Sequence, residues 1–89
     1  MSPAEKMLEK MRRTKAGWSQ DDFSTLYEGF GFVKEEKTRH TAYTHPEMPL
    51  VVAIVGRHRS LAKGYADDAV KNIDALKRIL ESETTDGSA

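Results

Sequence analysis

The hydrophobic period of this chain changes at Gly31, and this change constrains the fold more than any other feature of the sequence. Before Gly31, apolar side chains recur every three or four residues, as on one face of a helix. Between Phe32 and Val55 they fall in short β-branched and aromatic segments separated by polar turns. The helical period returns after Gly64. In a chain of 89 residues, this order predicts one small domain in which helices flank a run of strands.

Two helices are expected before this change. A first helix over residues 4–13 is predicted from three apolar residues at helical spacing, which are Met7, Leu8 and Met11. Ser19 is a candidate N-cap for a second helix, because its hydroxyl can accept a hydrogen bond from the first turn. Four apolar residues form one stripe of that helix: Phe23, Leu26, Tyr27 and Phe30. Gly29 and Gly31 allow the helix to end in a left-handed residue.

Three short strands are expected next, over residues 32–36, 41–45 and 50–55. Tight turns join them, so the sheet is predicted to be antiparallel. The third segment is almost continuously apolar, which indicates burial on both faces or a central position in the sheet. A last helix is expected to begin near Tyr65. Its apolar face has six members: Ala66, Ala69, Val70, Ile73, Leu76 and Leu80.

The expected fold is an α+β two-layer sandwich, a three-stranded antiparallel sheet covered by helices. Only the helices are available to cover one face of the sheet. Residues 1–16 are expected to form an N-terminal helical extension, and residues 17–82 the α-β-β-β-α domain. Residues 83–89 have no apolar pattern and are expected to form a flexible tail.

The composition excludes several classes of protein. The chain has no Cys, so it has neither a disulfide framework nor a thiolate metal site. No apolar run approaches the roughly 20 residues that cross a bilayer, and the N-terminus lacks the apolar segment of a secretory signal. A cytoplasmic protein with no membrane partner is therefore expected. The formal net charge of zero argues against nonspecific binding to polyanions.

The charge is nevertheless segregated along the chain. Residues 34–63 carry six Lys or Arg against three acidic residues, and they contain all 3 His. Residues 64–89 carry three basic and six acidic residues. The middle segment can therefore present a local basic face, although scattered solvated charge is the alternative reading of the same composition.

His40 is the candidate catalytic residue within this segment. Side chains alternate between the two faces of a strand, so His40, Ala42 and Thr44 share one face. If Tyr43 points to the core, His40 points away from it. An exposed imidazole can donate or accept a proton near neutral pH, as RNA cleavage requires at the 2′-OH or at the leaving oxygen. Five residues are candidates for contacts with the RNA: Arg39, Arg57, His58, Arg59 and Lys63.

Each histidine also has a purely structural explanation. A single His on a strand is more often a surface residue than a catalyst. His45 precedes Pro46 and is expected to cap a turn rather than to react. His58 lies between two arginines and either contacts phosphate or is simply solvated. A metal site is not expected, because neither the spacing of the three histidines nor a carboxylate pattern supports one.

The segment TRHTAYTHP at residues 38–46 resembles the motif region of the HicA family of toxins, small ribonucleases paired with HicB-type antitoxins. Members of that family have a helix ending in Gly followed by an aromatic residue, as at Gly31 and Phe32. A Gly-Ser-His motif, x-x-Tyr/Phe-x-His-Pro, an apolar strand, a basic loop and a last helix follow. Residues 50–55, 56–63 and 65–80 correspond to the last three, so the resemblance covers most of the chain.

The resemblance implies a fold like the double-stranded RNA-binding domain, with an extra helix at the N-terminus. It also implies metal-independent cleavage of mRNA, without a cofactor, by the motif histidine, which is His40 here. A HicB-like antitoxin would bind over that residue, and no contact of this chain with DNA is expected. Thr38 and Arg39 replace the Gly-Ser of the motif, so a catalytically inactive RNA-binding or protein-binding module on the same fold is the alternative function.

Overall fold

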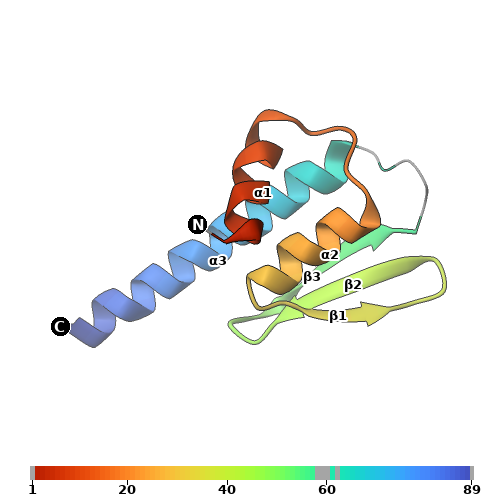
Figure 1. Ribbon diagram of the computed structural model, residues 1–89. Helices are drawn as coiled ribbons and strands as arrows, with labels where there is room; N and C mark the ends of the chain where they lie inside the picture. Colours follow the sequence, from red (N-terminus) through yellow and green to blue (C-terminus); the bar gives the residue numbers. More distant parts are fainter. Residues whose placement is uncertain (1, 58–60, 62, 89) are drawn as a thin grey trace.

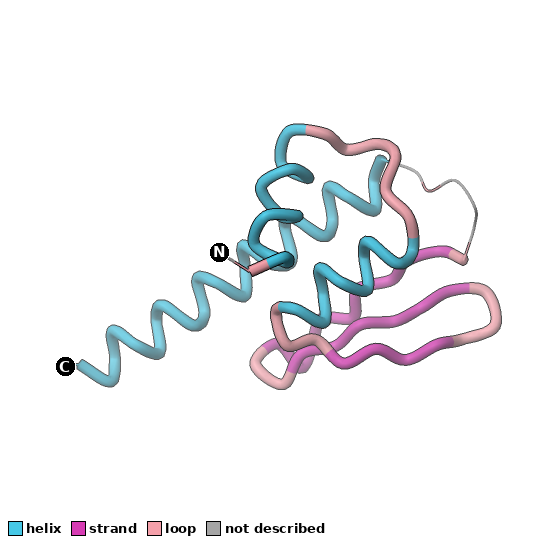
Figure 2. The backbone as a smooth tube through the Cα atoms, in the orientation of Figure 1, coloured by secondary structure: helices cyan, strands magenta, loops and turns pink. Residues whose placement is uncertain are grey.

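The fold is α+β, as the sequence predicts. The structure is a computed structural model that describes residues 2–57, 61 and 63–88, with the side chains of 83–88 left out of the description. The elements are α1 (Pro3–Arg13), α2 (Gln20–Gly29), β1 (Val33–Glu36), β2 (His40–His45), β3 (Met48–Gly56) and α3 (Lys63–Ser88). The three strands form one antiparallel sheet in the order β1-β2-β3, and the helices lie on one side of it (Figures 1 and 2).

The two N-terminal helices begin at serine caps. The Ser2 hydroxyl accepts a hydrogen bond from the backbone of Glu5 at 3.2 Å. At α2, the Ser19 hydroxyl accepts from Asp22 N, and the Asp22 carboxylate accepts from Ser19 N, which is a complete capping box. The predicted cap at Ser19 is therefore confirmed. After α2 the chain reverses at Gly31, whose φ is +92°.

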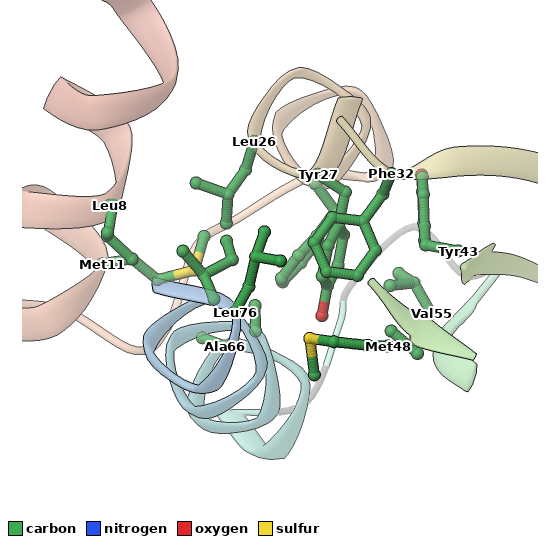
Figure 3. Packing of buried hydrophobic residues seen from close by; sticks show 14 residues of the cluster. Leu8, Met11, Leu26, Tyr27, Phe32, Tyr43, Met48, Val55, Ala66 and Leu76 are labelled. Carbon is green, nitrogen blue, oxygen red and sulfur yellow. The ribbon is translucent and has the colours of Figure 1, made fainter. Parts of the chain in front are cut away.

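The core lies between the sheet and all three helices (Figure 3). The rings of Tyr27 on α2 and Tyr43 on β2 stack with centroids 4.6 Å apart. Phe32 meets the Tyr27 ring edge-on at 5.0 Å. Because Tyr43 is buried in this stack, it defines the face of the sheet that the helices cover.

Helix α1 belongs to the same core, although the sequence set residues 1–16 apart as an extension. Leu8 and Met11 are fully buried in the cluster that also holds the sheet residues. At the surface, the Arg12 guanidinium binds both carboxylate oxygens of Asp74 on α3, at 2.8 and 2.6 Å. This bond raises the pKa of Arg12 and lowers the pKa of Asp74. The first helix is thus held by both apolar packing and a two-point ion pair.

Two elements differ from the sequence-based expectation. β3 lies at an edge of the sheet and is buried on one face only, so the prediction of a central or doubly buried strand is wrong. Its outer face is itself apolar and exposed, with Leu50 at 96% and Val52 at 55% exposure, and this removes the alternation that would reveal an edge strand. Helix α3 continues to Ser88 and includes residues predicted to form a tail.

Candidate functional site

His40 is the first residue of β2 and is half-buried at one end of the sheet. Its paired residue on β3 is Gly56, which has no side chain to cover the imidazole from that strand. Among the residues that the structure describes, no hydrogen bond is made by the His40 ring. Within this part of the chain, both ring nitrogens are therefore available to a bound molecule.

The pairing register settles which face of the sheet His40 occupies. Tyr43 points into the core, so the alternating residues His40 and Ala42 lie on the other face. Ala42 is paired with Glu35 on β1 and with Ile54 on β3, and directly opposed residues of antiparallel strands share a face. The sequence-based prediction that His40 faces away from the core is confirmed.

Backbone hydrogen bonds bring three basic residues to the end of the sheet where His40 lies. The backbone N–H of Lys37 donates to the carbonyl oxygen of His40 at 2.8 Å and closes the β1–β2 turn. Arg57, just after β3, donates its backbone N–H to the carbonyl of Arg39 at 3.2 Å. The Arg57 guanidinium donates to the Lys37 carbonyl at 3.0 Å. We call Lys37, Arg39, His40 and Arg57 the turn corner.

The two arginines of the turn corner approach it from a different side than the imidazole. Arg39 and Arg57 each neighbour a residue of the open face, His40 and Gly56 respectively. Because side chains alternate along a strand, the side chains of both arginines leave the backbone on the face opposite to that of His40. The guanidinium of Arg57 nevertheless lies against the turn that His40 closes. The Arg57 guanidinium can therefore reach a phosphate at the edge of the sheet rather than one centred over its open face.

Lys37 is the cation on the His40 face, and the sequence-based prediction omits it. Its ammonium lies 2.6 Å from a carboxylate oxygen of Glu35, which is on that face. The same contact lowers the pKa of Glu35. Both side chains are largely exposed, so the pair is a weak one that a phosphate can replace. Counting by twos from Val33 would have placed Lys37 on this face.

The other predicted contact residues are less constrained. Lys63 is the exposed first residue of α3, which starts on the same side of the molecule as the turn corner in Figure 1. His58 and Arg59 lie outside the described residues. Within the described part of the chain, no group of three or more His, Cys, Asp or Glu residues could hold a metal ion.

His45 has the structural role that its position before Pro46 indicates. Its Nδ1 accepts the backbone N–H of Glu47 at 3.0 Å. Its Nε2 therefore carries the proton and donates to the carbonyl of Phe30 at 3.2 Å. The ring also meets Phe32 edge-on at 5.1 Å. His45 thus ties the β2–β3 turn to the end of α2, and both of its nitrogens are occupied.

Comparison with known proteins adds nothing to this geometry, because no family model, curated protein or solved structure matches the chain. None of the described helices is both long and apolar enough to cross a membrane.

Proposed function

We propose that this chain is a metal-independent endoribonuclease of the HicA type, with His40 as its general acid or base. The observation that carries the proposal is a half-exposed imidazole, without a partner among the described residues, at a corner where three basic residues meet. The order α2-β1-β2-β3-α3 supports a likeness to the double-stranded RNA-binding domain. We include this likeness in the proposal. We also propose that the substrate is mRNA and that the protein acts in the cytoplasm.

The reaction needs only a proton transfer and a charge that offsets the phosphate. As a base, neutral His40 takes the proton of a ribose 2′-OH, whose oxygen attacks the adjacent phosphorus. The bond from phosphorus to the 5′ oxygen breaks, and a proton from solvent neutralises the leaving oxygen. As an acid, the protonated ring supplies that last proton instead, and a water molecule takes the proton of the 2′-OH. In either role, Lys37, Arg39 and Arg57 stabilise the charge that develops on the phosphate oxygens.

The test is RNA cleavage by the wild type and His40→Ala. The change is expected to lower the rate by roughly 10²- to 10⁴-fold, the usual contribution of general acid–base catalysis. Thr44→Ala is a matched control, since Thr44 is an exposed residue of the same strand and face. Thr44→Ala should cleave as fast as the wild type. Equal rates for the wild type and His40→Ala would show that the catalytic assignment is wrong.

A protein-binding module is the second candidate function, and the open face of the sheet favours it. Val33, Val52 and Ile54 are 59%, 55% and 42% exposed on this face, and Leu50 at the start of β3 is 96% exposed. An exposed apolar patch on a small protein often marks an interface. A HicB-like antitoxin that covers His40 would also bury this patch, so this surface suits either a regulated enzyme or an inactive module.

The two candidates differ in a titration with RNA. A binding module retains RNA, or an antitoxin alone, without producing shorter fragments. Retention of RNA through Z phosphate contacts gives a log–log salt slope of roughly −0.7Z. Retention with no cleavage by the wild type favours the module, and cleavage that requires His40 favours the enzyme.

A further inference from the structure

A hollow of about 380 Å³ lies between the end of α1 and the beginning of α2. Its volume falls in the range of small-molecule sites. Seven residues line it: Lys10, Arg13, Thr14, Ala16, Gly17, Trp18 and Asp22. The candidate catalytic site does not use this hollow, and the structural roles of Trp18 and Asp22 leave Lys10 and Arg13 unexplained.

The two cations of the hollow have no partner among the side chains that the structure describes. Lys10 and Arg13 are one turn apart on α1 and exposed, and in the described part of the chain neither forms an ion pair or a side-chain hydrogen bond. Other basic residues near this helix differ. Arg12 binds Asp74, and Lys15 donates to the carbonyl oxygen of Met11 at 2.9 Å. Lys10 and Arg13 are therefore available to an anion.

Trp18 supplies an aromatic wall in a fixed position. Its indole N–H donates to the carbonyl of Thr14 at 2.7 Å, and part of the ring packs on the core. The ring remains only half-buried and lines the hollow. A fixed aromatic face beside two cations is the arrangement on which proteins stack single-stranded bases while holding the phosphate.

Asp22 gives the hollow one negative charge and one acceptor. Its Oδ2 is used in the α2 capping box, where it accepts the backbone N–H of Ser19 at 2.9 Å. The same carboxylate can accept a hydrogen bond from a base edge. An anion alone would be repelled by it, whereas a nucleotide has both a phosphate for the cations and a base for the indole and the carboxylate.

The hollow is linked to the turn corner through the start of α2. Gln20, two residues after Trp18, donates its side-chain amide to the carbonyl of Gly56 at 2.9 Å. Gly56 is the residue paired with His40. In Figure 1 the start of α2, the end of β3 and the β1–β2 turn all lie on one side of the molecule. The start of α2 therefore joins the hollow to the strand residue that pairs with His40.

We propose that this hollow binds one nucleotide of single-stranded RNA that flanks the cleaved bond. The base stacks on Trp18, and Lys10 and Arg13 hold the phosphate. The choice of RNA as the ligand rests on the proposed function. With this site, α1 forms part of the surface that binds the substrate. Without it, the only role of α1 is to pack on the rest of the domain.

The test uses the fluorescence of Trp18, since the chain has 1 Trp and the signal is unambiguous. A short single-stranded RNA of mixed sequence is titrated into the His40→Ala protein, which leaves the RNA intact. Saturable quenching of the indole is expected. Arg13→Gln and Lys10→Gln should each weaken binding severalfold and reduce the log–log salt slope by roughly 0.7. Lys71→Gln, which removes an exposed charge from α3, should change neither.

The outcomes separate this inference from the proposed function. If labelled RNA binds but leaves the fluorescence unchanged, or if the three variants behave alike, the hollow is not the site, even where the wild type cleaves RNA. If the indole is quenched as expected and the wild type cleaves nothing, the binding site stands and the catalytic proposal fails. If no RNA binds, this inference is overturned, and cleavage by the wild type then decides the proposed function by itself.

Discussion

At the scale of single residues, Gly31 fixes how α2 connects to the sheet. Its φ of +92° lies in the region that favours glycine. A Cβ at this position would also lie 3.0 Å from Nε2 of His45. Since that nitrogen is already bonded to the Phe30 carbonyl, the ring cannot move without losing the contact that joins the β2–β3 turn to α2.

Gly31→Ala should therefore destabilise the protein by about 2 kcal/mol or more, from the left-handed backbone and the crowding of His45 together. Gly17→Ala is the matched control, because Gly17 has a φ of +87° but open space around its Cβ position. It should lose only about 1 kcal/mol. Urea unfolding of both variants measures the difference, and equal losses would show that His45 does not constrain this turn.

The residue scale also shows what the sequence could not predict about the site. The exposed direction of His40 followed from alternation once Tyr43 was assigned to the core. The position of Lys37 also followed from alternation, counted from Val33, but the prediction did not extend the count into the turn. The contact of Gln20 could not be predicted, because it joins residues 36 positions apart along the chain. Arg57 was predicted to contact RNA from the loop after the third strand, but its hydrogen bond to the Lys37 carbonyl was not predicted.

At the scale of elements, helix starts were predictable and sheet position was not. The cap at Ser19 is a local signal, and the capping box confirms it. The apolar run in β3 is ambiguous by itself, since an edge strand with an exposed apolar face has the same pattern as a buried strand. The length of α3 was underestimated because its last turns lack an apolar stripe.

The ion pair between Arg12 on α1 and Asp74 on α3 should make the free energy of unfolding depend on pH in the acid range. Asp74→Asn removes the carboxylate that the Arg12 guanidinium binds at two points, so we expect a loss of about 1 kcal/mol at pH 7. The pKa of Asp74 is lowered in the folded state. Its contribution is thus complete above the unfolded pKa of about 3.9 and disappears as the pH falls through the folded value.

Unfolding of the wild type and Asp74→Asn across this pH range measures that contribution. Asp67→Asn is the control, because Asp67 is 3.9 Å from Lys15 and its side chain is 60% exposed. That variant should match the wild type within a few tenths of a kcal/mol. A stability difference for Asp74→Asn that persists unchanged at the lowest pH would contradict the ion-pair explanation.

At the scale of the whole molecule, the aromatic core predicts the alkaline limit of stability. Burial raises the pKa of Tyr27 to about 12, and it also raises the pKa of Tyr43. Below the unfolded value of about 10 both states keep the proton. Between about 10 and 12 the unfolded chain loses the Tyr27 proton first, so stability falls by roughly 1.4 kcal/mol per pH unit for this group.

Tyr27→Phe should lower stability at pH 7, because Asn72 loses the hydroxyl to which it donates at 3.4 Å, but it should flatten the alkaline fall. Stability against pH for the two proteins, followed with tyrosinate absorbance, checks this. A fall of the same steepness in Tyr27→Phe would place the alkaline sensitivity elsewhere in the molecule.

At one end of the sheet, the His40 imidazole has no partner among the described residues and lies near basic residues. The most direct test of the proposed catalysis is single-turnover cleavage of RNA in the presence of a metal chelator, by the wild type and His40→Ala. The wild type is expected to cut RNA under these conditions, and His40→Ala is expected to be slower by at least about 100-fold. Equal rates, or a wild type that the chelator silences, would contradict the proposal.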